Sequence, residues 1–160
     1  MINFFIFIFS FYICLMSVFG YGNIFKKIFL NRLKIYEETN IYLGFYGLMF
    51  MTLIALFSSF FVQHNFYHNV FFHLIGLIYF FNSSIKKNIT FYKHIFFISI
   101  LLLPLLFISK THDDFSFYHY PFTKFLTEHH VIFGMGHINV GYNFLSSLFF
   151  LNSTFYLPFI

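Results

Sequence analysis

Long apolar runs separated by short polar segments dominate this sequence. A helix needs roughly 20 apolar residues to cross the hydrocarbon core of a bilayer, which is about 30 Å thick. The runs that approach this length are residues 2–19, 41–62, 66–81, 94–108 and 142–160. Backbone polar groups find no water in lipid and must bond within each run. We therefore predict an all-α fold, a polytopic transmembrane bundle of about five spans that forms a single membrane domain over residues 1–160.

Two of these runs contain residues that are uncommon in a simple span. The run over 66–81 is short and contains His68, Asn69 and His73, so it fits a tilted span, a re-entrant element or a partly buried helix. The run over 94–108 contains Pro104, where neighbouring helices can compensate for a kink. The side of the membrane on which each later segment lies therefore depends on the third run.

The composition supports a membrane protein. Apolar residues make up 59% of the chain and charged residues 9%. A water-soluble fold of 160 residues could not bury so many apolar side chains. The single cysteine, Cys14, lies in the first apolar run, which excludes an internal disulfide and a CxxC metal or redox site.

The basic residues indicate the orientation in the membrane. They are scattered in short segments between apolar runs instead of along one soluble face, so no nucleic-acid partner is predicted. Most follow the first and third runs, and these are Lys26, Lys27, Arg32, Lys34, Lys86, Lys87 and Lys93. The positive-inside rule places those segments in the cytoplasm. The N-terminus and the 110–140 loop are then expected outside the cytoplasmic membrane.

Carboxylates and imidazoles collect in the 110–140 loop. It contains Asp113, Asp114, Glu128, His112, His119, His129, His130 and His137. Titratable groups that gather directly after a span in so apolar a chain form a candidate site. A long solvated loop collects polar residues as well, and the sequence leaves both interpretations open.

Part of this loop has helical periodicity. Apolar side chains recur at i, i+4, i+7 and i+8, at Tyr118, Phe122, Phe125 and Leu126. The opposite face carries Thr123, Lys124, Thr127 and Glu128. Pro121 falls where a first helical turn tolerates proline. This pattern predicts a short amphipathic helix that lies in the outer membrane interface.

The segment after this helix favours a turn followed by a packed helix. Gly134, Gly136 and Gly141 predict a flexible turn into the run over 142–160. That run carries small polar residues on one helical stripe, at Asn143, Ser146, Ser147, Ser153 and Thr154. Such stripes usually pack against another helix, and we prefer this interpretation to a wall that faces a substrate.

His64 and His68 are spaced i, i+4, a spacing that could place two imidazoles on one metal ion. No carboxylate or cysteine lies near them in the sequence. Hydrogen bonds to loop backbone are the preferred interpretation.

The outer loop resembles part of a known enzyme group. The run Asp113-Asp114-Phe115-Ser116-Phe117-Tyr118-His119-Tyr120-Pro121, the Gly134-Met135-Gly136 turn, and Gly141-Tyr142-Asn143 with Ser146 and Ser147 carry the resemblance. Together they are similar to bacterial multi-span membrane proteins related to type C glycosyltransferases. These enzymes use polyprenyl-phosphate sugars as donors. The resemblance covers residues from Ser109 to the end and corresponds to the N-terminal portion of such proteins.

The resemblance implies roles for several residues. Asp114 would be the base that takes a proton from the acceptor hydroxyl, and Asp113 would be its neighbour or a metal ligand. The two carboxylates could hold a divalent cation that offsets leaving-group charge. His119 and Lys124 would contact phosphate, and Tyr118 would belong to the same substrate-binding motif. The expected partners are membrane lipid, a polyprenyl-phosphate sugar, and a lipid-linked or cell-surface glycan acceptor.

Two alternatives to a complete enzyme stay open. The chain ends inside an apolar run, so we expect it to be a fragment of a longer protein that is split from its remaining spans and inactive alone. A non-enzymatic transporter segment or accessory subunit would also fit. The first, second, fourth and fifth runs contain no Asp, Glu, Lys or Arg. This argues against an ion-coupled transporter, which usually has such residues within its spans.

Overall fold

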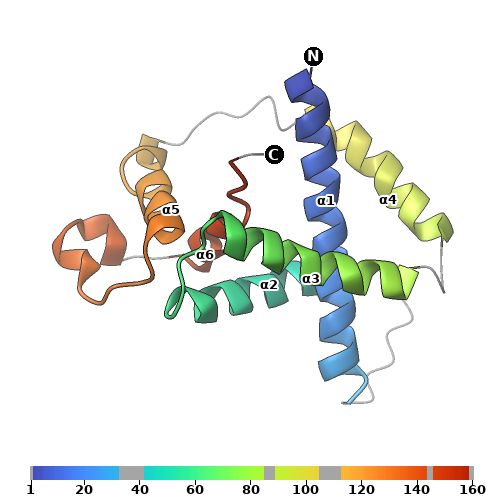
Figure 1. The fold of residues 1–160 in the computed structure, drawn as a ribbon, viewed down its shortest axis with the longest axis horizontal. Helices are drawn as coiled ribbons and strands as arrows, with labels where there is room; N and C mark the ends of the chain where they lie inside the picture. Colours follow the sequence, from blue (N-terminus) through green and yellow to red (C-terminus); the bar gives the residue numbers. More distant parts are fainter. Residues whose placement is uncertain (1, 33–41, 85–88, 105–112, 144–145, 159–160) are drawn as a thin grey trace.

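The computed structural model describes residues 2–32, 42–84, 89–104, 113–143 and 146–158, and these ranges contain helices and loops but no strand (Figure 1). The α-helices are α1 (Ile2–Phe25), α2 (Leu43–Ser59), α3 (Phe66–Ser84), α4 (Ile89–Leu102), α5 (His119–Glu128) and α6 (Ser147–Thr154). Shorter helical segments are η1 (Lys26–Leu30), η4 (Asp113–Phe115), η5 (Met135–His137) and η6 (Val140–Asn143). The all-α prediction is confirmed over the described ranges.

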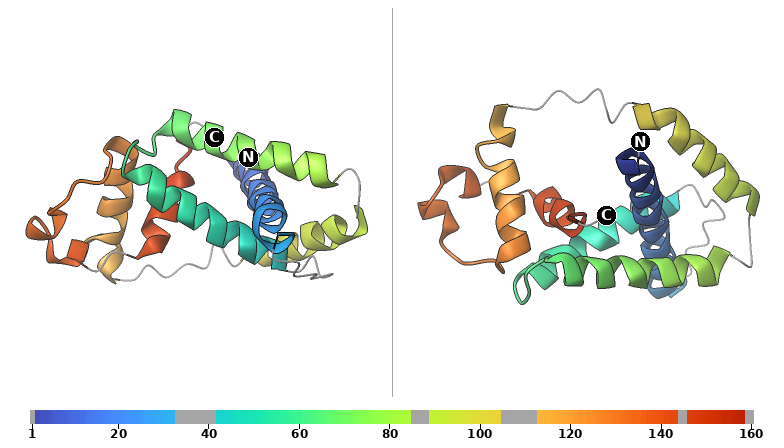
Figure 2. Two further views of the ribbon diagram at one scale, coloured as in Figure 1. Left: turned by 90° about the horizontal axis from the view of Figure 1, so that it is seen from below. Right: turned by 45° about the horizontal axis from the view of Figure 1, so that its top comes forward.

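Helix α1 passes between α2 and α3 and crosses both of them (Figures 1 and 2). Glycines allow the backbones to approach closely at these crossings. A Cβ at Gly20 would overlap the carbonyl oxygen of Gly76 on α3, and a Cβ at Gly47 on α2 would overlap that of Val18. Small residues at helix crossings are typical of membrane proteins, where close packing must hold helices together.

The prediction that the first span ends at Phe19 is wrong. Helix α1 continues to Phe25 and then through the π-helical turn η1 to Leu30. Gly20 and Gly22 would favour an end in isolation, but here their missing side chains make room for α3 and α2. The segment Phe4–Leu30 is the one helix in the described ranges that is both long and apolar enough to cross a membrane.

The helices predicted over 41–62 and 66–81 are confirmed as α2 and α3. The fourth run is predicted over 94–108, whereas α4 begins earlier, at Ile89, and ends at Leu102. Residues 105–108 of the predicted run lie outside the described ranges. Leu103 and Pro104 form a 3-10 turn directly after α4, so the proline follows the α-helix instead of kinking it. Proline disfavours α-helical backbone in the residue before it, which is consistent with the end of α4 at Leu102.

The prediction of one spanning helix over 142–160 is wrong. Residues 140–143 form η6, and α6 covers only Ser147–Thr154. Eight residues reach about 12 Å, well short of a bilayer core. The Ser146 side chain accepts a hydrogen bond from the Leu148 amide and begins the helix, and the chain leaves helical geometry before Pro158.

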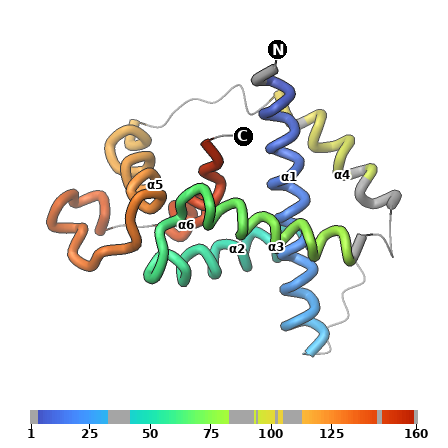
Figure 3. The backbone as a smooth tube through the Cα atoms, in the orientation of Figure 1, coloured from blue at the N-terminus to red at the C-terminus, as the bar shows by residue number. Residues whose placement is uncertain are grey.

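The residues from 113 onward fold into a lobe against one end of α2 and α3, as the backbone trace shows (Figure 3). We call residues 113–143 and 146–158 the C-terminal lobe. Its core consists of Phe122, Leu126, Met135, Phe149 and Phe150, with Ala55 from α2. A second core joins α1, α2, α3 and α6 through Val18, Tyr21, Ile24, Met51, Phe72 and Leu151. Helices α2 and α6 thus connect the lobe to the crossing helices.

Candidate functional site

The predicted catalytic carboxylates lie at the start of the C-terminal lobe. Asp113 is exposed and Asp114 is partly exposed, both in η4. The Asp114 carbonyl accepts hydrogen bonds of 3.2 Å from the amides of Phe117 and Tyr118, which fixes the turn into α5. Large apolar side chains beside the carboxylates are exposed, at Phe115, Phe117 and Tyr120. The acidic pair is therefore part of an amphipathic surface.

Helix α5 is present as predicted, with Pro121 in its first turn. Its apolar residues Phe122 and Leu126 are fully buried, but against α2 and α6 of the protein itself. The prediction that Thr127 lies on the polar face is wrong. The residue is only 4% exposed, and its hydroxyl donates to the Lys124 carbonyl at 2.7 Å. The hydroxyl is satisfied locally, so the position tolerates burial.

Tyr118 and His119 pack together on α6. The two rings lie 4.3 Å apart between centroids, and the His119 ring lies 4.9 Å from that of Phe149. A Cβ at Gly141 would lie 2.7 Å from the Tyr118 ring, so the glycine accommodates this aromatic side chain. Both predicted substrate-binding residues are thus anchored by aromatic packing.

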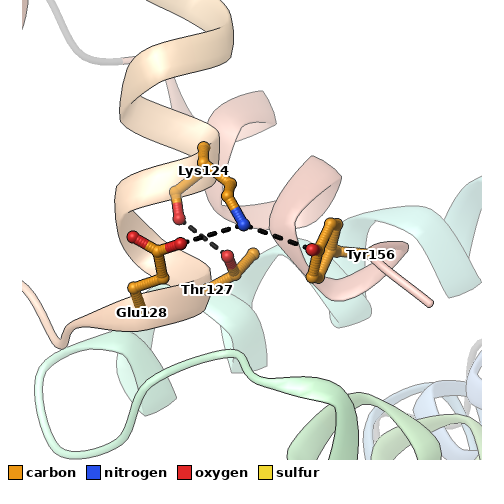
Figure 4. A network of polar contacts seen from close by, with 4 residues as sticks. All are labelled: Lys124, Thr127, Glu128 and Tyr156. Atoms are coloured by element: carbon orange, nitrogen blue, oxygen red, sulfur yellow. Dashed lines mark hydrogen bonds and ion pairs between the residues drawn. The ribbon is translucent and has the colours of Figure 1, made fainter. Parts of the chain in front are cut away.

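Lys124 takes part in a different polar group (Figure 4). Its ammonium lies 2.9 Å from the Glu128 carboxylate and donates to the Tyr156 hydroxyl at 3.2 Å. The hydrogen bond with Glu128 raises the pKa of Lys124 and lowers the pKa of Glu128. A phosphate group would reach Lys124 in competition with this carboxylate. The i, i+4 spacing of the pair is the sequence signal that identifies it.

The described residues contain no group of three or more histidine, cysteine or acidic side chains that could hold a metal ion. His112, next to the acidic pair, lies outside them. Metal binding by Asp113 and Asp114 stays a prediction.

The polar residues that interact most extensively lie elsewhere, at the junction of α3 and α6. His64, Asn69, His73, Ser153 and Thr154 are at most 2% exposed, and we call them the buried polar cluster. All buried side-chain nitrogen and oxygen atoms in the described residues have a hydrogen-bond partner. Burial of polar groups is costly unless they are paired, so this completeness is what allows the cluster to be buried.

Asn69 is the centre of the cluster. Its amide nitrogen lies 2.8–2.9 Å from three carbonyl oxygens, those of His64, Ser153 and Tyr156. Its amide oxygen accepts from His68 Nδ1 at 3.0 Å. Because the last carbonyls of a helix lack partners within the helix, Asn69 acts as a C-cap of α6 supplied by α3.

His73 completes this cap. Its Nε2 lies 3.1 Å from the Thr154 carbonyl, which can only accept, so this nitrogen carries the proton. Its Nδ1 then accepts from the Ser17 hydroxyl of α1, also at 3.1 Å. One imidazole therefore connects α1, α3 and α6.

His64 joins the turn between α2 and α3 to α6. Its Nδ1 lies 2.6 Å from the Ser153 hydroxyl and its Nε2 lies 2.8 Å from that of Ser58. Burial lowers the pKa of His64 to about 3, with repulsion from His68 as a smaller cause. Both ring nitrogens of His64 are thus paired with hydroxyls, which accounts for the burial of this imidazole.

The small polar stripe predicted to pack is confirmed at Ser153 and Thr154. The sequence did not identify Asn69 as their partner. A signal was present, because Asn69, His73 and Gly76 recur at i, i+4 and i+7 and define one face of α3. The prediction that His64 and His68 bond to loop backbone is wrong, because their ring nitrogens bond to the side chains of Ser58, Ser153 and Asn69.

A pocket of about 500 Å³ lies between the 61–65 turn and the end of α5. Its polar lining residues are Gln63, Asn65, His68, Glu128, His129 and His130. The His64 amide donates to the Leu126 carbonyl at 2.7 Å, and the Val131 amide donates to the Ser59 carbonyl at 2.8 Å. The fold thus brings these titratable groups together from two distant parts of the sequence.

Residues 4–160 match a family described as a domain of unknown function, DUF8201. No curated protein and no solved structure matches the chain.

Proposed function

The chain belongs to the DUF8201 family, and we propose that it is a multi-span protein of the cytoplasmic membrane whose C-terminal lobe lies outside the cytoplasm.

The observation that carries this proposal is the exposure of apolar side chains along four helices. On α1 they are Phe4, Phe5, Ile6, Phe7 and Phe9; on α2, Phe45, Leu48, Met49, Leu53 and Phe57; on α3, Phe71, Leu74, Ile78, Tyr79 and Phe81; on α4, Phe96, Phe97, Ile98, Ile100 and Leu101. Soluble monomers rarely expose such extensive apolar surface. Lipid around α1, α2, α3 and α4 would cover it.

The packing of the lobe supports the orientation. With α1 to α4 as spans and the N-terminus outside, the turn between α2 and α3 and the C-terminal lobe belong to the same side. These two parts are hydrogen-bonded to each other. Lys26 and Lys27 lie in η1, at the end of α1 that is far from α5 in Figure 1. Residues 142–143 and 146–158 belong to the C-terminal lobe, so the proposed arrangement has four spans and no fifth span.

Within this arrangement we infer that the lobe takes part in glycosyl transfer from a polyprenyl-phosphate sugar to a glycan acceptor. The support is the resemblance of residues 113–121 together with the placement of Asp113 and Asp114 beside exposed Phe115 and Phe117. Aromatic side chains at a membrane surface would keep the carboxylates where the phosphate of a lipid-linked donor emerges. Asp114 would then accept the proton of the attacking hydroxyl.

Replacing Asp114 with asparagine is expected to lower sugar transfer by about 100-fold or more, because an amide cannot act as the base. The measurement uses membranes that contain the full chain, supplied with polyprenyl-phosphate carrying a radiolabelled hexose. Glu128→Gln is the matched control, since Glu128 is an acidic residue of the same lobe that pairs with Lys124. Transfer that survives Asp114→Asn at the level of the control contradicts the enzymatic role.

A second candidate is a non-enzymatic membrane subunit. The observation that favours it is that Lys124 is engaged by Glu128 and Tyr156, and that Tyr118 and His119 are packed on α6. This role predicts that Asp113→Asn and Asp114→Asn change neither membrane insertion nor co-purification with partner proteins.

A further inference from the structure

A groove of about 420 Å³ lies between α1 and α4, with the end of α3 beside it. Its volume falls within the range of small-molecule sites. Tyr12, Leu15, Met16 and Phe19 of α1 form one wall, and Ile95, Phe96 and Phe97 of α4 form the other. The walls touch at Tyr12, whose ring stacks on that of Phe96 with centroids 4.6 Å apart and whose hydroxyl accepts a hydrogen bond from Ser99 at 3.3 Å. The groove is thus apolar along both walls.

Lys93 is the one charged side chain among the described residues that line this groove. It is exposed, and no hydrogen bond or ion pair joins its ammonium to the described part of the chain. This contrasts with Lys124, which is held by Glu128. An apolar groove with an exposed cation at its border is complementary to a molecule that has an apolar chain and an anionic group.

We propose that the groove binds an anionic phospholipid, with an acyl chain along the walls of α1 and α4 and the phosphate beside Lys93. The proposal rests on the membrane placement given above, because a lipid reaches the groove from a bilayer. That placement puts Lys93 on the cytoplasmic side, where anionic lipids are bound by basic sites between spans. A zwitterionic lipid brings its own cation together with its phosphate and offers Lys93 no net negative charge, and free phosphate would leave the apolar walls uncovered.

The test compares binding of fluorescent phosphatidylglycerol and phosphatidylcholine to the full chain purified in neutral detergent micelles. We expect phosphatidylglycerol to bind more tightly, and Lys93→Gln to reduce this preference about fivefold, the effect of one basic residue near an anionic lipid. The matched control is Lys124→Gln, which should keep the preference because Lys124 is paired with Glu128. Leu15→Trp, which narrows the groove, should weaken binding of both lipids.

Three results would overturn the lipid site. They are an unchanged preference in Lys93→Gln, an equal loss in Lys124→Gln, and displacement by millimolar inorganic phosphate, which would identify a free-phosphate site. The micelle assay is independent of topology and transfer. A retained preference in a chain that fails to enter membranes would overturn the proposed function alone.

Discussion

Replacing Asn69 with leucine is expected to lower the free energy of unfolding by about 3–5 kcal/mol. Leucine has a similar size but cannot donate to the carbonyls of His64, Ser153 and Tyr156. A buried carbonyl that loses its partner costs about 1–3 kcal/mol, and the carbonyls of His64 and Tyr156 are affected together, while that of Ser153 keeps the Tyr156 amide at 3.3 Å. The measurement is denaturant-induced unfolding of the purified chain in detergent micelles.

Asn152 provides the matched control for this experiment. It lies on α6, next to Ser153, but its side chain is exposed. Asn152→Leu should change the free energy of unfolding by less than about 0.5 kcal/mol, as is usual for surface substitutions. If Asn69→Leu is equally harmless, the account of Asn69 as the cap of α6 is wrong.

A methyl group at Gly47 is expected to produce the second large effect. The Cβ of alanine would overlap the carbonyl oxygen of Val18, which is backbone of α1 and cannot move aside as a flexible side chain could. The two helices must separate, and we expect Gly47→Ala to destabilise the chain by about 2–4 kcal/mol, at the upper end for overpacking. The same unfolding measurement detects it.

Gly44 lies one turn earlier on α2 and makes a sharp comparison. A Cβ there would lie 3.4 Å from the Phe19 ring, an ordinary contact. Because alanine is the better helix former, Gly44→Ala should stabilise the chain by about 0.5–1 kcal/mol. Effects of the same sign and size at Gly44 and Gly47 would mean that the α1–α2 crossing does not depend on close backbone contact.

Helix existence could be predicted from the sequence where apolar runs were long. The run that became α2 needed only its length and its lack of charge, whereas the shorter run that became α3 also fitted a re-entrant element because of His68, Asn69 and His73. The periodicity around Phe122 and Leu126 likewise sufficed for α5. In each case the local pattern and the final packing favour the same structure.

The errors have a common physical cause, namely contacts between segments far apart in the chain. The end of α1 could not be placed because Gly20 and Gly22 look like helix terminators until α2 and α3 pack on them. The run over 142–160 is apolar enough for a span, yet Asn69 and His73 bind the carbonyls at the end of α6 and hold it within the lobe. Apolar content alone does not report such capping partners.

The candidate site was predictable in composition but not in arrangement. The motif from Asp113 to Pro121 gave the carboxylates, which do lie on an exposed surface. It could not show that Tyr118 and His119 pack on Phe149, because that contact depends on the position of α6. The pairing of Lys124 with Glu128 could be read from i, i+4 spacing, whereas the Tyr156 hydroxyl could not.

Sidedness in the membrane is the claim on which the other proposals depend. Single cysteines at Gln63, Ser116 and Arg32, all exposed, in a Cys14→Ser background can be treated with a membrane-impermeant maleimide on intact cells. We predict that the cysteines at 63 and 116 react from outside and that the cysteine at 32 reacts only after permeabilisation. Labelling of positions 63 and 116 from opposite sides, or of position 32 from outside, would contradict the account.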